Sequence, residues 1–257
     1  NRVSMAAREQ LDATFAELGN TPLYKEIYDR TLKILDSRDR IAYPRIIGDK
    51  LYNFWQDADH KRGIFRRTTW SDYLAGNPKW ETVIDVDSIS KGEGVTFSFA
   101  GASCFDPEDR LCMVSLSKGG SDASEAREFD LRTGRFVKDG FRLPAAKKSI
   151  AWVDANTLLV GTDYGPGTTT SSGYARLIKL WKRGTPLSSA TTVYEAPATN
   201  MGVFVGDTDA GDRRYVEIAD RFAHWDALEV RFRGETIRSA GHGFSGIARR
   251  RLLEILH

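Results

Sequence analysis

The chain has 257 residues, of which 41% are hydrophobic and 28% are charged. These fractions are ordinary for a soluble globular protein and exclude an intrinsically disordered chain. The 37 basic residues nearly balance the 35 acidic ones, which gives no support to a nucleic-acid or membrane partner. No apolar run is long enough to span a bilayer, and the first ten residues lack the apolar core of a signal peptide.

Residues 1–40 predict two amphipathic helices. Leu11, Phe15 and Leu18 fall at positions i, i+4 and i+7, which places them on one helical face. Gly19-Asn20 interrupts this pattern, and Thr21-Pro22 supplies an N-cap and a first helical residue for the second helix. The apolar face of that helix is predicted to hold Tyr24, Ile27, Tyr28, Thr31 and Leu35. Both faces need a surface to pack against.

After residue 40, short β-rich runs alternate with Gly, Asp, Asn and Pro turns. The runs form groups of four within residues 43–87, 97–141, 148–197 and 202–239, and a fifth group begins at 245. The groups repeat about every 50 residues, which is the length of a propeller blade. A β-sandwich would not favour a four-strand period. The sequence therefore predicts an all-β propeller of about four complete four-stranded blades and part of a fifth, an incomplete ring preceded by the two helices.

Three segments carry a resemblance to a known family: residues 39–73, GTDYGPG at 161–167 and KLWKRGTPL at 179–187. They resemble the N-terminal region of bacterial prolyl-oligopeptidase-family serine peptidases. The resemblance implies that helices 1–40 pack on an α/β-hydrolase domain, that residues 41–257 are part of the propeller, and that a Ser-Asp-His triad lies in the hydrolase domain. We therefore expect a non-catalytic portion that controls the access of short peptides, in a chain that stops before the hydrolase domain.

No catalytic, metal-binding or cofactor-binding residue is predicted in this chain. The hydrolase nucleophile elbow, G-x-S-x-G, is absent, because the nearest run, Gly243–Gly246, has Ile247 where the last glycine belongs. None of the four histidines lies in a motif with a base and an orienting group; they are His60, His224, His242 and His257. Metal-ligand spacings and glycine-rich phosphate loops are also absent.

Strand direction predicts which loops share a face. In a four-stranded antiparallel blade, loops between the second and third strands lie at the same end as the blade-to-blade links, where we expect the hydrolase domain. The loops in this chain are 57–62, 118–125, 163–173 and 220–226, and loops on a rigid scaffold commonly carry binding function. The candidate residues are Asp57, His60, Asp163, Tyr164, His224 and Trp225. A flexible solvent loop is the alternative interpretation of 163–173.

The two cysteines, Cys104 and Cys112, flank a predicted hairpin turn and could face each other across two strands. They form either a redox clip or two buried thiols. Two cysteines fit a reducing compartment and exclude a disulfide framework, so we expect thiols and a cytoplasmic protein.

Expected partners are short peptides, bound through the hydrolase domain, with no nucleic acid and no membrane. A free-standing propeller used as a binding scaffold, or an enzyme with its site in the propeller channel, are the alternatives. An unclosed ring should also expose apolar surface and cause self-association. The residues expected in that surface are Ile46, Leu51 and Leu253 on the sheets, and Leu11, Phe15, Tyr24 and Ile27 on the helices.

Overall fold

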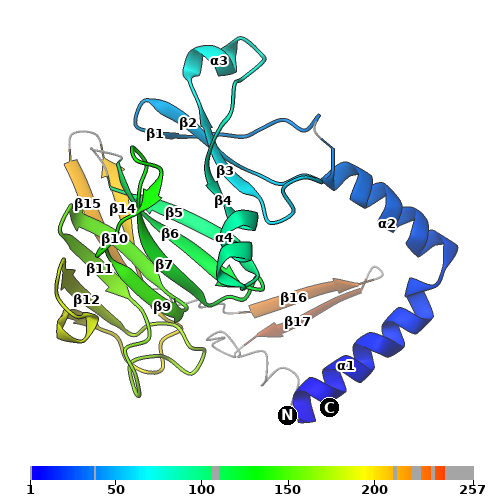
Figure 1. Cartoon of the computed structure of the whole chain (residues 1–257). Coiled ribbons are helices and arrows are strands. Elements are labelled where there is room, and N and C mark those ends of the chain that lie inside the picture. The colour runs from blue at the N-terminus through cyan, green and yellow to red at the C-terminus, as the bar shows by residue number, and fades with distance from the viewer. Residues whose placement is uncertain are drawn as a thin grey trace. The chain divides into compact units, whose positions relative to one another are not determined.

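The protein is represented by a computed structural model that describes residues 2–37, 39–105, 110–210, 213–220, 227–232 and 235–240 (Figure 1). The chain divides into two compact units, residues 1–89 and 90–257. Within the described ranges, no helix is long and apolar enough to cross a membrane.

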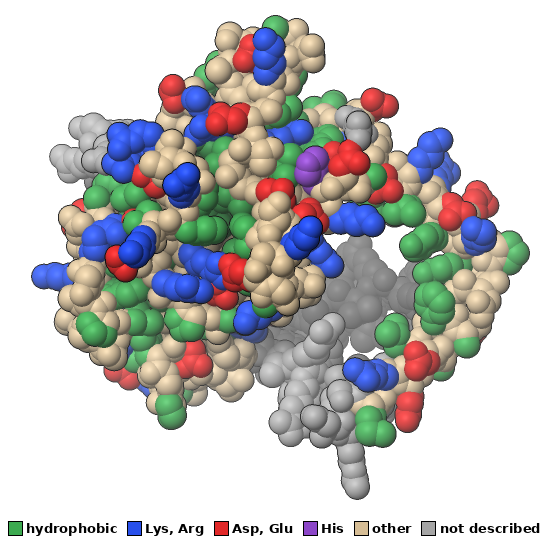
Figure 2. All heavy atoms as spheres, in the orientation of Figure 1, with side chains coloured by type: hydrophobic (Ala, Val, Ile, Leu, Met, Phe, Trp, Pro, Cys, Tyr) green, Lys and Arg blue, Asp and Glu red, His purple; other side chains and the backbone are tan. Residues whose placement is uncertain are grey.

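The two predicted N-terminal helices are confirmed. Helix α1 covers Arg2–Thr14 and continues as a π-helical turn, η1, over Phe15–Gly19. Helix α2 covers Pro22–Leu35, and the Oγ1 of its N-cap Thr21 accepts a hydrogen bond from the Tyr24 backbone N–H at 3.2 Å. No residue of η1 or α2 is buried. Figure 2 shows the hydrophobic side chains uncovered along these helices, and the most exposed include Leu11, Phe15, Leu18, Leu23 and Ile27.

The first unit contains one four-stranded antiparallel sheet in the order β1-β2-β3-β4. Its strands are β1 (Arg45–Ile47), β2 (Lys50–Trp55), β3 (Ile64–Thr68) and β4 (Glu81–Asp85). The turn between β1 and β2 uses Gly48 at φ 60°, a conformation that glycine adopts without steric cost. Two short helices were not predicted: α3 (Trp70–Leu74) lies between β3 and β4, and α4 (Val86–Glu93) follows β4.

The second sheet has five strands, one more than the four predicted. It contains β5 (Phe97–Cys104), β6 (Leu111–Lys118), β7 (Ser124–Asp130), β8 (Arg135–Phe136) and β9 (Arg142–Ala146). Both β8 and β9 pair with β7, so two short strands share the edge predicted for one. The interruption falls at Asp139, whose φ of 27° is incompatible with extended strand geometry.

The third sheet has the predicted four strands and contributes to a buried apolar cluster on each of its faces. They are β10 (Ser149–Asp154), β11 (Thr157–Gly161), β12 (Leu177–Lys182) and β13 (Thr191–Glu195), with a 3₁₀ turn, η2 (Leu187–Ser189), before β13. One face joins the preceding sheet in a core of Phe105, Met113, Ala126, Phe141, Leu143, Trp152, Leu158, Val160 and Trp181. The other face joins the next hairpin through Ala151, Leu159, Ile178, Ala196, Val203 and Val205.

The fourth group of strands forms two hairpins in place of the predicted four-stranded sheet. Strands β14 (Val203–Ala210) and β15 (Arg213–Asp220) pair in one, and β16 (Ala227–Phe232) and β17 (Glu235–Ala240) pair in the other. The strands themselves lie where the sequence placed them. The fifth group, from residue 245, lies outside the described residues.

The prediction of two free thiols is wrong, because Cys104 and Cys112 form a disulfide. The two residues are directly opposite each other in the β5–β6 register, and cross-strand neighbours place their side chains within reach of one another. The compartment argument that favoured thiols therefore loses its basis, and the cytoplasmic location stays a prediction.

The apolar surface expected from an open ring is present in part. Ile46 is 60% exposed, and the side chains of Leu11, Phe15, Tyr24 and Ile27 are exposed as well. The expectation is wrong for Leu51, which is only 2% exposed because β2 is an inner strand of its sheet. Leu253 lies outside the described residues. Self-association through this surface stays a prediction.

Candidate functional site

The blade-to-blade link and two loops meet at one end of the second unit, which we call the connection face. Lys147 lies in the link between β9 and β10. Its ammonium is 3.9 Å from the Asp122 carboxylate in the β6–β7 loop, and it donates to the Ser172 carbonyl in the β11–β12 loop at 3.2 Å. It also lies 4.4 Å from the Tyr174 ring centroid. Strand direction therefore groups these loops as the sequence argument requires.

The β11–β12 loop, residues 162–176, is held by its own hydrogen bonds. The Asp163 carboxylate accepts from the Gly165 backbone N–H at 2.8 Å, and Thr168 Oγ1 accepts from the Tyr164 N–H at 2.9 Å. Arg176 closes the base of the loop by donating to the Gly167 carbonyl at 2.6 Å and the Glu195 carboxylate at 2.7 Å. These contacts favour a defined surface over the flexible solvent loop that was the alternative.

The predicted site residue Tyr164 is half-buried. Its hydroxyl donates to the Val160 carbonyl at 2.7 Å, and burial raises the pKa of the phenol above its usual value. The Lys179 ammonium lies 4.5 Å from the ring centroid. Tyr164 and Asp163 thus shape the loop, while His224 and Trp225, the other candidates in this unit, lie outside the described residues.

In the first unit, Asp57 and His60 are brought together in the β2–β3 loop. The half-buried Asp57 carboxylate accepts from the Trp55 indole N–H, the His60 backbone N–H and the His60 ring Nδ1, each at 2.9 Å. It also accepts from the Asp59 N–H at 3.0 Å. Burial raises the pKa of Asp57, but these donors together lower it to about 2. Asp57 is therefore an ionised group that organises the turn.

This histidine–carboxylate pair could not be inferred from sequence spacing, and it is not a catalytic triad. His60 is part-exposed, and Asp57 orients its ring. Among the described residues, no hydroxyl or thiol forms a hydrogen bond with His60. The adjacent Arg62 backbone N–H donates to the Asp87 carboxylate at 2.9 Å, which ties the loop to the segment after β4. The loop and the blade-end segment again share one end of the sheet.

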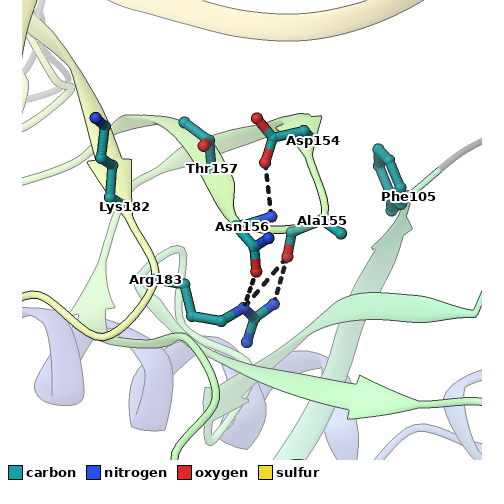
Figure 3. Close-up of a pocket in the computed structure, with 7 residues that line it drawn as sticks. All are labelled: Phe105, Asp154, Ala155, Asn156, Thr157, Lys182 and Arg183. Carbon is teal, nitrogen blue, oxygen red and sulfur yellow. Dashed lines mark hydrogen bonds between the residues drawn. The ribbon is translucent and has the colours of Figure 1, made fainter.

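The opposite end of the third sheet contains a pocket of about 640 Å³ around the β10–β11 turn (Figure 3). The Arg183 guanidinium donates to the Ala155 carbonyl at 2.6 Å and to Asn156 Oδ1 at 3.0 Å. The Asn156 backbone N–H donates to the Asp154 carboxylate at 2.7 Å. These hydrogen bonds fix the β10–β11 turn. Because the polar groups already bond to one another, they leave few donors or acceptors for a ligand.

The comparisons with known proteins agree with this architecture. A family model described as the N-terminal β-propeller domain of prolyl oligopeptidase matches residues 8–231. The chain belongs to the prolyl oligopeptidase family.

Two relatives of this propeller chain are named as uncharacterized peptidases. The one from Sinorhizobium fredii is 44% identical over 205 residues, which cover 79% of this chain and 28% of the relative. The one from Rickettsia prowazekii is 31% identical over 200 residues, covering 74% of this chain and 28% of the relative. The prolyl oligopeptidase propeller described here thus corresponds to little more than a quarter of each relative.

Solved structures show the same fold. A post-proline cleaving enzyme from Rickettsia typhi has a TM-score of 0.76 and 26% identity, and the match covers 94% of this chain and 37% of that enzyme. Oligopeptidase B from Leishmania major has a TM-score of 0.56 and 14% identity, covering 85% and 32%. The propeller fold predicted from the strand pattern is confirmed, although the ring is not closed within the described residues.

Beside the connection face of this prolyl oligopeptidase propeller, Lys148 is an unusual cation that sequence reasoning missed. Its ammonium donates to the Ser124 carbonyl and, at 2.7 Å, to Ser124 Oγ. Burial lowers the pKa of Lys148 to about 8, against an opposing attraction from Glu125. The link between the second and third sheets therefore contains a group that titrates near neutral pH.

Replacing Lys148 with methionine should change how stability depends on pH. The folded pKa of about 8 is below the ordinary lysine pKa of 10.5, so the unfolded chain binds more protons between these values. The wild type therefore gains stability as pH rises through this range. The methionine variant lacks that gain. Urea unfolding of both proteins at pH 8 and pH 10 measures the difference. Lys148→Arg, which also removes the titrating group, should behave like Lys148→Met, and parallel curves for all three proteins would contradict the prediction.

Proposed function

We propose that this chain is the non-catalytic propeller portion of a prolyl-oligopeptidase-like serine peptidase, and that it limits access to a hydrolase domain to short peptides. The family match carries the proposal. Two peptidase relatives, with 44% and 31% identity, extend well beyond the matched region. That region makes up only 28% of each relative's length. In those relatives, the remainder is long enough to hold a further domain.

The exposed helices support this proposal. Helix α2 and turn η1 have no buried residue, and Phe15, Tyr24 and Tyr28 form a continuous aromatic contact with ring centroids 5.5 and 6.2 Å apart. An apolar surface of this kind is uncommon on isolated soluble domains and is typical of a docking surface. We propose that it packs on the hydrolase domain.

A chimera tests the proposal. Residues of this chain that align with the Sinorhizobium fredii relative should replace the corresponding part of that protein. We expect the chimera to cleave a short proline-containing chromogenic peptide and to leave a long unfolded protein intact. In a variant whose hydrolase domain folds, deleting the propeller residues that this chain contributes to the chimera should remove the size limit.

The matched control is the unaltered relative, which should show the same size selectivity. A serine-directed inhibitor should abolish cleavage in both proteins. A chimera that folds and cleaves the long protein as fast as the short peptide would contradict the gating role. The 257-residue chain alone should show no cleavage that this inhibitor blocks.

A further inference from the structure

The first unit contains an arginine enclosed between two tryptophans. The guanidinium of Arg66, on β3, lies 4.1 Å from the Trp55 ring centroid and 4.3 Å from the Trp80 ring centroid. Arg40 also lies over the Trp55 ring, at 4.5 Å. Arg66 is 9% exposed and Trp55 is 8% exposed. Arg66 thus contacts both indole rings, and Arg40 contacts the Trp55 ring, in cation–π interactions.

Neither cation has a carboxylate partner within the described part of the chain. Arg66 donates through Nε to Asn53 Oδ1 at 3.1 Å, and no other hydrogen bond of its guanidinium occurs among the described residues. Arg40 donates to the backbone carbonyls of Ser37 and Gln56. A buried charge is normally paired with an opposite charge, because desolvation is costly. The remaining N–H groups of Arg66 have no hydrogen-bond partner among the described residues and can therefore accept a ligand as partner.

The acidic group that acts on Arg66 through space is already engaged. The Asp57 carboxylate accepts the Trp55 indole N–H and three donors from its own turn, so it fixes Trp55 and acts on Arg66 only through space. Burial lowers the pKa of Arg66 to about 10, and Asp57 opposes that shift. Arg66 is therefore a full cation at neutral pH.

These groups line a pocket of about 560 Å³. Its lining includes the two cations, both indoles and Tyr73, together with the exposed Asp39 and Asn77. The Tyr73 hydroxyl donates to the Ala42 carbonyl at 2.8 Å, which fixes the segment before β1 against α3. Its lining combines aromatic surface with charged and polar groups, and converging polar groups of this kind fix the orientation of a small ligand.

We propose that this pocket binds a ligand carboxylate, carried by a small organic acid or by the C-terminus of a short peptide, with Arg66 as its partner. The guanidinium fork matches a carboxylate in a planar bidentate pair. A planar carboxylate lies in the plane of the guanidinium that it binds, so both of its oxygens can accept from the fork. A tetrahedral phosphate has oxygens outside that plane, which the fork cannot reach.

The first experiment needs no variant. The 257-residue chain is titrated with benzoate and with benzamide, its neutral analogue of the same shape, and binding is followed by calorimetry and by tryptophan emission. We expect saturable binding of benzoate and at least about tenfold weaker binding of benzamide, because a charge-assisted pair is lost. Equal binding of the two, no binding of benzoate, or stronger binding of inorganic phosphate would overturn the proposal.

A second arm identifies the source of the carboxylate. The same chain is titrated with an N-acetylated dipeptide that has a free C-terminus and with the corresponding C-terminal amide. Tighter binding of the peptide acid than of benzoate assigns the pocket to peptide C-termini, and the reverse assigns it to small aromatic acids. Either result requires that the acid bind more tightly than its amide.

Variants then locate the binding to Arg66. Arg66→Met preserves much of the packing between the indoles and should weaken benzoate binding by about tenfold or more. Arg66→Lys keeps the charge but loses the planar fork and should also weaken it. The matched control is Arg67→Met, which removes the same charge from the next residue of β3, where the side chain bonds to Glu81 at 2.7 Å. Wild-type binding in a folded Arg66→Met protein would overturn the proposal.

Discussion

Replacing Arg183 with methionine should lower the free energy of unfolding by about 3–5 kcal/mol, because it leaves a buried charge without its partner. Glu128 is 1% exposed, and both of its carboxylate oxygens accept from the Arg183 guanidinium at 2.8 Å. The same carboxylate accepts from the Phe141 backbone N–H at 2.7 Å. Glu128 lies on β7 and Arg183 follows β12, so the pair joins two sheets.

Urea unfolding followed by far-UV circular dichroism measures this effect. The matched control is Arg142→Met, since Arg142 is largely exposed and its nearest contact with the Glu125 carboxylate is a long one, at 4.0 Å. This control should change the free energy of unfolding by no more than about 0.5 kcal/mol. Adding Glu128→Gln to Arg183→Met should recover part of the loss, because the amide is neutral and still offers an acceptor to Phe141. A single-variant loss below about 1 kcal/mol would show that water or another cation compensates Glu128.

Trp152→Ala should cost about 3–5 kcal/mol, as expected when a large aromatic side chain is removed from a core. Trp152 is fully buried and lies between Phe105 and Phe141, with ring centroids 5.8 and 5.9 Å away. Its indole N–H donates to the Ser103 carbonyl at 2.9 Å. The alanine variant therefore loses packing between two sheets and leaves a buried carbonyl without its donor.

Two comparison variants separate these contributions in the same unfolding assay. Trp152→Phe keeps most of the aromatic packing and should lose less stability than Trp152→Ala. Trp70→Ala removes an indole that is 45% exposed at the start of α3, and it should cost about 1 kcal/mol or less. Similar losses for Trp152→Ala and Trp70→Ala would contradict the inter-sheet core.

Most strands could be predicted from the sequence because turn residues and β-rich runs are local signals. Strands β10 and β11 lie where the pattern placed them, since their apolar residues are bounded by Asp154 and Asn156. The split of the fourth strand of the second sheet was missed, because the positive φ at Asp139 leaves no clear compositional mark. The short helix α4 was missed because eight residues without a long apolar stripe give a weak periodic signal.

The site was less predictable because it depends on contacts across strands and loops. Strand direction alone correctly grouped the loops around Lys147 with the blade link. The pairing of Asp57 with His60 depends on the geometry of the turn, which the sequence does not show. The pairing of Glu128 with Arg183 depends on the packing of two sheets, so it could not be predicted from local sequence. One signal was available for Arg66: it alternates with Ile64 and Thr68 on β3, so it had to share their buried face.

The hydrogen bonds between neighbouring sheets also determine how this chain can fold. The bonds of Trp152 to Ser103, of Arg183 to Glu128 and of Val205 to Ser149 join residues 49, 55 and 56 positions apart. Each separation is close to one repeat, so the third sheet and the β14–β15 hairpin each bond to the sheet just before them in the chain. Assembly can then advance from one sheet to the next during synthesis, and loop-closure entropy stays nearly constant at each addition. Only the joining of the last blade to the first would require a contact of long sequence separation.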